Sequence, residues 1–402
     1  MMTAAQCMKQ ILLCKPADYV PNLEWGPMSP RIVHEWKRQG MPLDADMWEY
    51  FGLDGGVEYL CGNMFDPIPG VPNQGVIAET SDTKTYRDSW GTVTEWPKDL
   101  TQADGRHRTV RNAITSPDDW QGIRSHFDPT DPHRYPGGEE LVTWKHGLLY
   151  PPAPVGCCTW SYDTIDTLRR TGRRLTQLNA PSQVGDLKEF LGFEYLCSCM
   201  YLDPELLANI NTVRADCVVG VLERILPRAV PDILHFWEDI GFNNGPMLQP
   251  EMMDTLAVPY YRRIIDTYRS HGGEIVSVDS DGDIRLLMPY WLKAGVNHFW
   301  PMEVKANMDV VALRKEYGHS FSMRGGVSKY ALLEGREAID RELDRIAPVV
   351  QEGGYIPMLD HQIPVGVSFD NFSYYIEQKE KLLGARPDAH GASQAMYTEA
   401  TG

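Results

Sequence analysis

The second half of the chain alternates short apolar segments with amphipathic segments, and this alternation constrains the fold more than any other feature. Helical periodicity is clear after residue 250, where large side chains recur every four residues at Met252, Leu256, Tyr260, Ile264 and Tyr268. Strands that alternate with helices through short connections are typical of parallel sheets built from βα units. Five strands are predicted, at residues 233–237, 274–278, 296–300, 321–324 and 355–359.

Proline and glycine mark the ends of the predicted helices. One helix opens at Pro250 and closes at Gly272-Gly273, and the next runs from Ile284 to a glycine stop at Gly295. The following helices stop at Gly318 and at Gly353-Gly354, and the last covers residues 369–383. Five consecutive βα units favour a closed barrel or a doubly wound sheet, but no Gly-x-Gly-x-x-Gly follows any predicted strand, which argues against a dinucleotide-binding fold.

Three further strands are expected in the first half, at residues 19–25, 57–62 and 148–155, which brings the total to eight. Residues 85–96 alternate like a β-hairpin that turns near Gly91, and residues 101–136 read as a loop with a short helix. The prediction is an α/β chain, a (β/α)8 TIM barrel with an N-terminal β-hairpin and helical insertions. Residues 1–384 would form this single domain, and the small, polar residues 385–402 a disordered tail.

Composition narrows the class of partner. The chain has 38 basic and 55 acidic residues, a formal charge of −17, so nucleic acids and anionic membranes are poor partners. Its N-terminus lacks the apolar core of a signal peptide, because the longest run there is Ile11-Leu12-Leu13. Eight sparse cysteines indicate reduced thiols. A cytoplasmic protein is expected, and the serine hydrolase, P-loop and zincin motifs are missing from the sequence.

Barrel enzymes carry their active residues on loops that leave the carboxyl ends of the strands. The strongest candidate among such loops is Val278-Asp279-Ser280-Asp281-Gly282-Asp283, which holds three carboxylates within five residues. Carboxylates this close repel one another, so they indicate a metal or proton-transfer site. The alternative is a solvated turn in which Asp283 caps the helix that follows.

Two weaker candidates stand at the ends of later strands. Glu303 follows the predicted strand 296–300, and its alternative role is that of a surface or helix-capping carboxylate. His361 follows the last strand and suits either a metal ligand or a proton donor, although a lone histidine is more often structural. No cysteine lies beyond Cys217, so a metal at these strand ends would have only oxygen and imidazole ligands.

A fourth loop, residues 237–246, interleaves acidic and amide groups with aromatic rings. Such a mixture suits the wall of a pocket for an aromatic ligand, and a polar loop with packing aromatics is the alternative. The candidate substrate-binding residues are Trp237, Asp239, Phe242, Asn243 and, after a later strand, Arg324.

Taken together, these segments resemble the uroporphyrinogen decarboxylase superfamily from about Tyr19 to Leu383. The matching segments are Val20–Glu24, Trp36–Pro42, Tyr50–Asp54, Ser89–Gly91, Asn244–Met247, Asp279–Asp283, Arg324–Gly326 and Gly353–Ile356. The resemblance implies a barrel fold and either of two activities, porphyrinogen decarboxylation or corrinoid-dependent methyl transfer. True decarboxylases carry an arginine-rich N-terminal segment that grips several carboxylates, and residues 36–42 offer only one lysine and one arginine.

The methyltransferase branch binds zinc through a His-x-Cys pair and a later Cys, where this sequence has Asp279, Asp281 and His361. Oxygen and imidazole ligands leave zinc more positive than thiolates do, which suits polarisation of an ether oxygen. The resemblance therefore predicts methyl transfer from a methoxylated, aromatic small molecule to a separate corrinoid protein, with catalytic residues Asp281, Glu303 and His361. The alternatives are a metal-free decarboxylase and a non-catalytic barrel that binds a small molecule or a corrinoid partner. A homodimer stays open as the oligomeric state.

Overall fold

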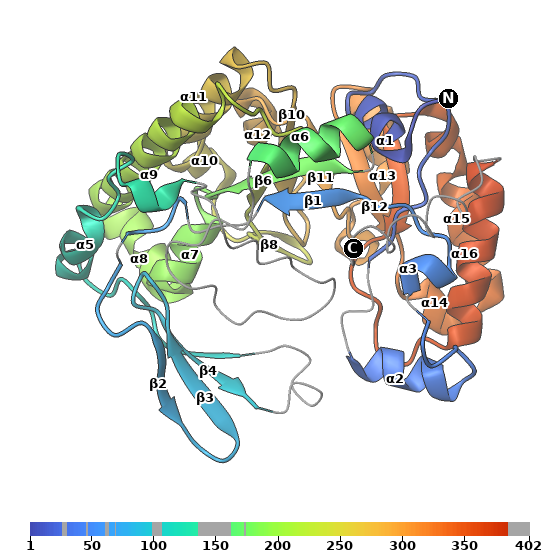
Figure 1. The fold of residues 1–402 in the computed structure, drawn as a ribbon, viewed down its shortest axis with the longest axis horizontal. Helices are drawn as coiled ribbons and strands as arrows, with labels where there is room; N and C mark the ends of the chain where they lie inside the picture. The colour runs from blue at the N-terminus through green and yellow to red at the C-terminus, as the bar shows by residue number, and fades with distance from the viewer. Residues whose placement is uncertain are drawn as a thin grey trace.

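The structure is a computed structural model that describes residues 1–25, 30–45, 47–60, 64–68, 70–98, 107–135, 162–172 and 174–384. At its centre lies a seven-stranded sheet in which every neighbouring pair is parallel (Figure 1). Its order is β1 (Val57–Leu60), β6 (Leu175–Ala180), β7 (Ile233–Trp237), β10 (Ile275–Asp279), β11 (His298–Trp300), β12 (Ser322–Val327) and β13 (Tyr355–Leu359). The five strands predicted in the second half and the α/β class are confirmed.

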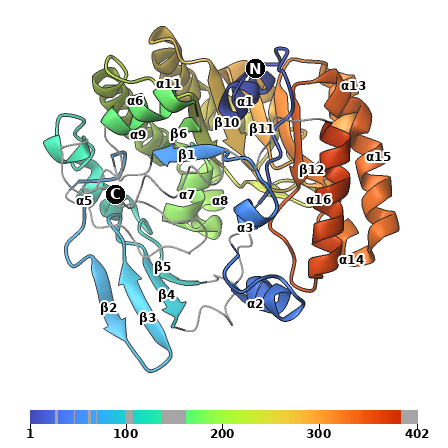
Figure 2. The ribbon, with the colours of Figure 1, turned by 45° about the vertical axis from the view of Figure 1, so that its right-hand side comes forward.

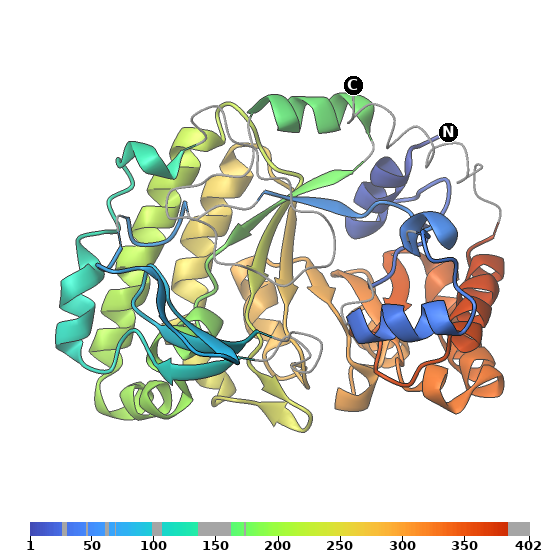
Figure 3. The same cartoon turned by 60° about the horizontal axis from the view of Figure 1, so that its bottom comes forward.

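Helices surround this sheet on its outer side (Figure 3). They are α6 (Tyr162–Thr171), α7 (Gly185–Leu191), α8 (Phe193–Leu202), α9 (Pro204–Ile225), α10 (Met253–Leu256), α11 (Val258–Ser270), α12 (Met288–Ala294), α13 (Val310–Tyr317), α14 (Ala331–Glu334), α15 (Arg336–Glu352) and α16 (Phe369–Leu383). Alternate strand residues such as Phe236, Val278 and Phe299 are buried in the large core formed with these helices. A sheet buried on both faces explains the near-continuous apolar character of its strands.

Helix α1 (Ala4–Leu12) closes the amino-terminal end of the barrel. Its Ala5, Met8, Ile11 and Leu12 form one apolar cluster with residues near the beginnings of the strands, namely Val57, Leu175, Ile233, Ile275 and Ile356. Thr3 caps the helix with a capping box, in which its hydroxyl accepts from the Gln6 amide. The interior of the barrel is therefore packed at this end, and any chemistry belongs to the opposite end.

The predicted strand at 19–25 is not hydrogen-bonded as a strand, but its chain occupies the place of the eighth. Trp25 donates its indole N–H to the Leu359 carbonyl at the end of β13 (2.8 Å). On the other side, Asn22 exchanges hydrogen bonds with Asp54, three residues before β1. Glu24 lies buried beneath this segment and accepts from Tyr375 and Lys379 of α16 and from the Leu359 amide. The ring is thus closed largely through side chains instead of a backbone ladder.

The observed elements differ from the sequence predictions in three other places. Strand β6 was not predicted, because Thr176, Gln177 and Asn179 break its apolar pattern, while the predicted strand 148–155 lies outside the described residues. The helix predicted from Pro250 is broken into a 3-10 turn (Pro250–Met252), α10 and α11, with a break at Ala257. The helix predicted from Ile284 begins only at Met288. The last helix, α16, has the predicted bounds.

A second sheet extends away from the barrel (Figures 1 and 2). It is antiparallel and consists of β2 (Gly75–Glu79), β3 (Thr83–Arg87), β4 (Val93–Pro97) and β5 (Arg108–Arg111). The predicted hairpin is β3–β4, and its turn forms because Asp88 accepts from the amides of Trp90, Gly91 and Thr92. The remaining elements are α2 (Pro30–Arg38), α3 (Met47–Tyr50), α5 (Pro117–Arg124), the 3-10 turns at Pro132–Arg134 and Val304–Ala306, and the short hairpin β8 (Gly241–Phe242) with β9 (Gly245–Pro246).

Helices long and apolar enough to cross a membrane are not found in the described ranges. The predicted tail, residues 385–402, lies outside those ranges.

Candidate active site at the carboxyl ends of the strands

Asp281 and His361 meet at the carboxyl end of the barrel. The Nε2 atom of His361 lies 3.1 Å from Oδ2 of Asp281, and both side chains are partly exposed. Asp281 follows β10 and His361 follows β13, so the pair spans a part of the sheet in which β11 and β12 lie between them. The structure therefore brings together two of the predicted site residues that are far apart in the sequence.

A network of buried and partly buried polar groups holds both loops in place. Glu303 accepts from the Gly282 amide (3.0 Å) and pairs with Lys329 (3.1 Å). Asp360 accepts from the amides of Val304 and Lys329, both at 2.9 Å. Because Gly282 adjoins Asp281 and Asp360 adjoins His361, these contacts position the pair.

Burial raises the pKa of Asp360 to about 6, although the hydrogen bonds it accepts oppose that shift. Glu303, predicted to be catalytic, has both carboxylate oxygens engaged in the network. Its contacts suit a positioning residue better than an acid that reaches a substrate.

Close packing between the loops after β7 and β10 also sets the position of Asp281. The Ile240 amide donates to the Ser280 hydroxyl, and the Asp283 amide donates to the Phe242 carbonyl. A Cβ atom on Gly282, whose φ is +85°, would lie 2.4 Å from the carbonyl carbon of Gly241. Only glycine allows this approach.

Asp283, the third aspartate of the loop, is paired with Arg285 (2.6 Å), and the hydrogen bonds from Arg285 lower its pKa. Since α12 begins at Met288, with Leu287 at its N-cap, the alternative role of Asp283 as a helix cap is not observed.

Strand register places Asp279 on the inner face of the barrel between Trp237 and Trp300. Its pKa is raised well above the ordinary value, first by burial and then by the charge of Asp281, while Arg324 acts in the opposite direction. The guanidinium carbon of Arg324 lies 3.9 Å from the centre of the Trp300 ring. Arg324, predicted to bind substrate, is thus a buried cation inside the barrel.

Two histidines that the sequence did not single out lie one layer deeper. His235, Ser277, His298 and Ser322 occupy adjacent register positions on four neighbouring strands. Burial and then the charge of Arg324 lower the pKa of His235 to about 3, and the same two causes depress that of His298. A histidine inside an apolar strand, as in Ile-Leu-His-Phe-Trp and Asn-His-Phe-Trp, was the available signal.

The Trp25 side chain links the inner residues of the barrel to the Asp281–His361 pair at its carboxyl end. Trp25 lies 5.2 Å from Trp300 and stacks on His361 at 5.6 Å between ring centres. Trp25 was not among the predicted site residues, because its position depends on the closure of the ring by residues 21–25.

The predicted aromatic wall is more exposed than a binding wall would be. Trp237 is 48% exposed with the Lys188 ammonium 5.9 Å from its ring centre, and Lys188 also donates to Asp239. Phe242 is 46% exposed and touches the edge of Phe193, while Asn243 is exposed on the β8–β9 hairpin.

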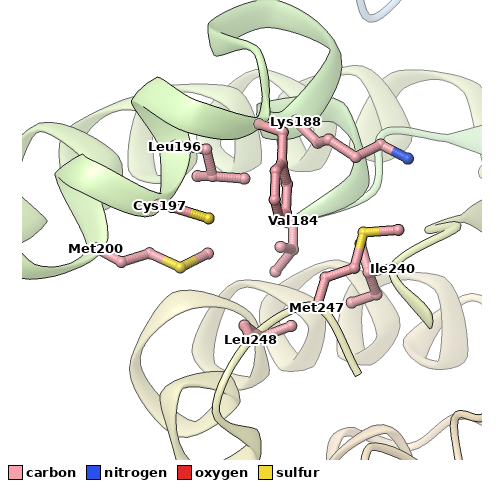
Figure 4. Close-up of a pocket in the computed structure, with 9 residues that line it drawn as sticks. Val184, Lys188, Leu196, Cys197, Met200, Ile240, Met247 and Leu248 are labelled. Carbon is pink, nitrogen blue, oxygen red and sulfur yellow. The ribbon is translucent and has the colours of Figure 1, made fainter. Parts of the chain in front are cut away.

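A small apolar pocket lies beside this loop (Figure 4). It is lined by Val184, Lys188, Phe193, Leu196, Cys197, Met200, Ile240, Met247 and Leu248. Lys188 and the Cys197 thiol are its only ionisable groups, so its lining offers packing instead of acid–base chemistry.

The predicted zinc ligands can be compared with the groups that are present. Asp281 and His361 supply two donors, but among the residues with described positions no three His, Cys, Asp or Glu side chains form a group that could hold a metal. The described residues include the free cysteines Cys7, Cys14, Cys197, Cys199 and Cys217. Burial raises the pKa of the Cys217 thiol to about 11. The described donors fit a proton-transfer pair better than a metal centre, and zinc stays a prediction.

Comparison with known proteins agrees with this geometry. Residues 188–382 match the family model for uroporphyrinogen decarboxylase (URO-D). Among solved structures, a methyltransferase from Methanosarcina mazei aligns with a TM-score of 0.54 at 11% identity, over 96% of this chain and 100% of that one, which shows a shared fold. A Xaa-Pro dipeptidase with bound methionine aligns only at a TM-score of 0.29 and 13% identity, over 55% of this chain and 58% of that one, too weakly for any inference. No curated protein sequence matches significantly. Residues 188–382, which contain β7, β10 to β13, Asp281 and His361, are thus similar to the uroporphyrinogen decarboxylase family, and the chain has an α/β TIM-barrel fold.

Proposed function

We propose that this protein is a methyltransferase that moves a methyl group from a methoxylated aromatic compound to a corrinoid carried by a partner protein. The observation that carries the proposal is the Asp281–His361 pair, which stands partly exposed at the mouth of the barrel. Around it, Trp25 and Trp300 supply aromatic surface on which a ring could stack.

An ether oxygen is a poor leaving group unless its developing charge is neutralised. When the bond between oxygen and methyl carbon breaks, the electron pair stays on oxygen, and a proton from His361 converts the phenoxide to a phenol. The carboxylate of Asp281 stabilises the protonated imidazole before that transfer and orients the ring. The corrinoid of the partner supplies the nucleophile that accepts the methyl group, and the chain's own residues bind, orient and protonate.

Three features favour methyl transfer over decarboxylation of a porphyrinogen. The chain carries a formal charge of −17 and lacks an arginine-rich N-terminal segment, so a substrate with many carboxylates would be repelled. The methyltransferase from Methanosarcina mazei is matched over its whole length. The zinc predicted from the resemblance enters no step of this mechanism, because the described donors are two.

Decarboxylation is the second candidate, and the description of the matching family favours it. In that reaction the same pair would protonate the carbon from which carbon dioxide has departed, without a metal. The two candidates release different products, so one experiment separates them.

The test uses 4-methoxybenzoate as the donor and reduced cobalamin as the acceptor, with the full chain as catalyst. We expect phenol formation coupled to loss of the reduced cobalamin absorbance, and a decrease of about 10² to 10⁴-fold in Asp281→Asn and His361→Gln. Asp283→Asn is the matched control, since it removes a carboxylate from the same loop whose partner is Arg285.

Carbon dioxide release from a porphyrinogen, with no methyl transfer from methoxybenzoates, would replace the proposal with the second candidate. Equal methyl transfer in the Asp281 and His361 variants would reject the assigned roles. Elemental analysis of the same preparation tests the zinc prediction independently.

A further inference from the structure

An exposed apolar surface, formed by α8 and the loop that carries the β8–β9 hairpin, takes no part in the proposed proton transfer. We call it the α8 surface, and its aromatic members Phe193, Trp237 and Phe242 are 43%, 48% and 46% exposed. The rings of Phe193 and Phe242 pack edge to face with their centres 6.1 Å apart. Lys188, whose ammonium lies 5.9 Å from the centre of the Trp237 ring, lines the same pocket as Phe193. The three rings therefore belong to one surface.

The small apolar pocket opens within the α8 surface (Figure 4). Cys197 and Met200 of α8 line it together with Met247 and Leu248, which follow β9. Methionine side chains are flexible and polarisable, so they are common at surfaces that accept apolar side chains of a partner. Exposed apolar surface with polar residues at its edge is typical of protein–protein contacts. The pocket and the rings around it thus have the character of a docking surface.

The α8 surface adjoins the loop that carries Asp281. The amide of Asp283 in that loop donates to the Phe242 carbonyl (2.8 Å). A Cβ atom on Gly241 would lie only 2.5 Å from the Asp281 carbonyl oxygen, so the backbones of the two loops are in direct contact. A protein that covers the α8 surface would therefore also reach the Asp281–His361 pair, where the proposed reaction must hand over the methyl group.

The two segments that build the α8 surface are strongly acidic. Residues 185–205 contain one basic residue, Lys188, and five acidic ones, which are Asp186, Glu189, Glu194, Asp203 and Glu205. Residues 237–254 contain no lysine or arginine and four acidic residues, which are Glu238, Asp239, Glu251 and Asp254. Lys188 is already engaged, because it donates to Asp239. Since charges at the edge of an interface select the partner, a partner of this surface should present basic residues around an apolar side chain.

We propose that the α8 surface is the docking site of the corrinoid-bearing partner protein, which inserts an apolar side chain into the pocket and surrounds it with lysine or arginine residues. The inference rests on the proposed function for the identity of the partner. Apolar anchors that fill pockets supply most of the binding energy of such interfaces, and complementary charges around them raise the association rate. Docking here holds the partner against the loop that carries Asp281.

Cysteine labelling locates the docked partner without any methyl transfer. The full chain is immobilised and loaded with an extract of the cells that make it, and the retained cobalamin is measured by its absorbance. N-ethylmaleimide then labels the loaded and unloaded chains, and mass spectrometry follows Cys197 in the pocket and Cys14, which lies beside Gly354 at the other end of the barrel. We expect retained cobalamin and about tenfold slower labelling of Cys197, with the labelling of Cys14 unchanged.

Two variants with matched controls test the two parts of the surface. Phe193→Asn removes an aromatic wall of the pocket and should weaken binding of the cobalamin-bearing protein about 10- to 100-fold. Leu333→Asn, which removes an equally exposed apolar side chain from α14, should leave binding unchanged. Glu194→Lys reverses an exposed charge beside the pocket and should weaken binding several-fold, most strongly at low salt. Glu337→Lys makes the same charge change on α15 and should have no effect.

Three results would overturn the proposal. Absence of retained cobalamin, or its retention with full labelling of Cys197, would show that the partner does not cover the pocket. Equal binding of the cobalamin-bearing protein by Phe193→Asn and the original protein would exclude the pocket as its anchor site. A homodimer in light scattering that Phe193→Asn converts to a monomer would assign the surface to a second copy of the chain.

The failure of this inference can be distinguished from failure of the proposed function. All four variants should form phenol with free reduced cobalamin at the original rate, because none of them alters the Asp281–His361 pair. If the cobalamin-bearing protein protects Cys197 but 4-methoxybenzoate yields no phenol, the docking site stands and methyl transfer falls. If phenol forms with free cobalamin but no cobalamin-bearing protein protects Cys197, methyl transfer stands and the docking site falls.

Discussion

The buried histidine His235 should make the protein sensitive to mild acid. In the unfolded chain a histidine takes up its proton near pH 6.5, whereas in the folded protein burial and Arg324 lower the pKa of His235 to about 3. Between these values the unfolded state binds more protons than the native state. The stability associated with neutral His235 is therefore fully present above pH 6.5 and is lost as the pH falls toward 3.

The size of the effect follows from the size of the shift. Each pKa unit corresponds to about 1.4 kcal/mol. The shift of His235 from 6.5 to about 3 therefore lowers the free energy of unfolding by about 5 kcal/mol below pH 3. At pH 5, which lies about one and a half units below the unfolded value, the loss is about 2 kcal/mol. This is a large part of the 5–15 kcal/mol that typically separates folded from unfolded states.

Urea unfolding at pH 7 and at pH 5 measures this quantity. Between the two pH values, we expect the free energy of unfolding to fall by about 2 kcal/mol more in the original protein than in His235→Asn. His34→Asn, which removes an exposed imidazole from α2, should lose as much as the original protein. In an Arg324→Gln background the difference should shrink, because one of the two causes of the shift has been removed.

An equal loss in the original protein and in His235→Asn would refute the reasoning. It would mean that His235 is already protonated or solvated in the folded state, and that the interior of the barrel around it is more polar than its burial implies. A direct readout is the titration of ¹³C-labelled histidine by NMR, in which the imidazole of His235 should stay neutral down to about pH 3.

Three further outcomes test the scaffold. Glu303→Ala should lower the free energy of unfolding in urea by about 3 kcal/mol, because it leaves the largely buried ammonium of Lys329 without its carboxylate. Glu303→Leu combined with Lys329→Met should recover most of that loss, and no recovery would show that the ion pair is not the cause. Lys379→Met should lower the free energy of unfolding by about 3–5 kcal/mol and expose residues 21–25 to limited proteolysis, because it leaves the Glu24 carboxylate buried without its cation. Unchanged proteolysis would contradict the role of this pair in closing the ring. Gly282→Ala should lower methyl transfer more than about tenfold with the barrel still folded, because the added Cβ meets the preceding loop, and full activity would show that the loop moves freely.

The sequence by itself determined the local and periodic parts of this protein. The strands β7 and β10 to β13 and the bounds of α16 follow from apolar runs and helical spacing, because such patterns depend on residues a few positions apart. The strand-end rule similarly directed attention to Asp281 and His361, since each directly follows a strand. Strand β6 escaped prediction because the interior of this barrel is polar, so its inward residues look like those of a loop.

Only the tertiary structure decided how these pieces meet. The distance between Asp281 and His361, the engagement of Glu303 by Lys329 and the position of Trp25 all depend on contacts between distant parts of the chain. The same is true of His235 and His298, which stand in apolar strands and feel the charge of Arg324 only because the strand register brings them together in the interior. No local spacing encodes such contacts, because they arise from the closure of the barrel, which sets the inner face that each alternate residue shares.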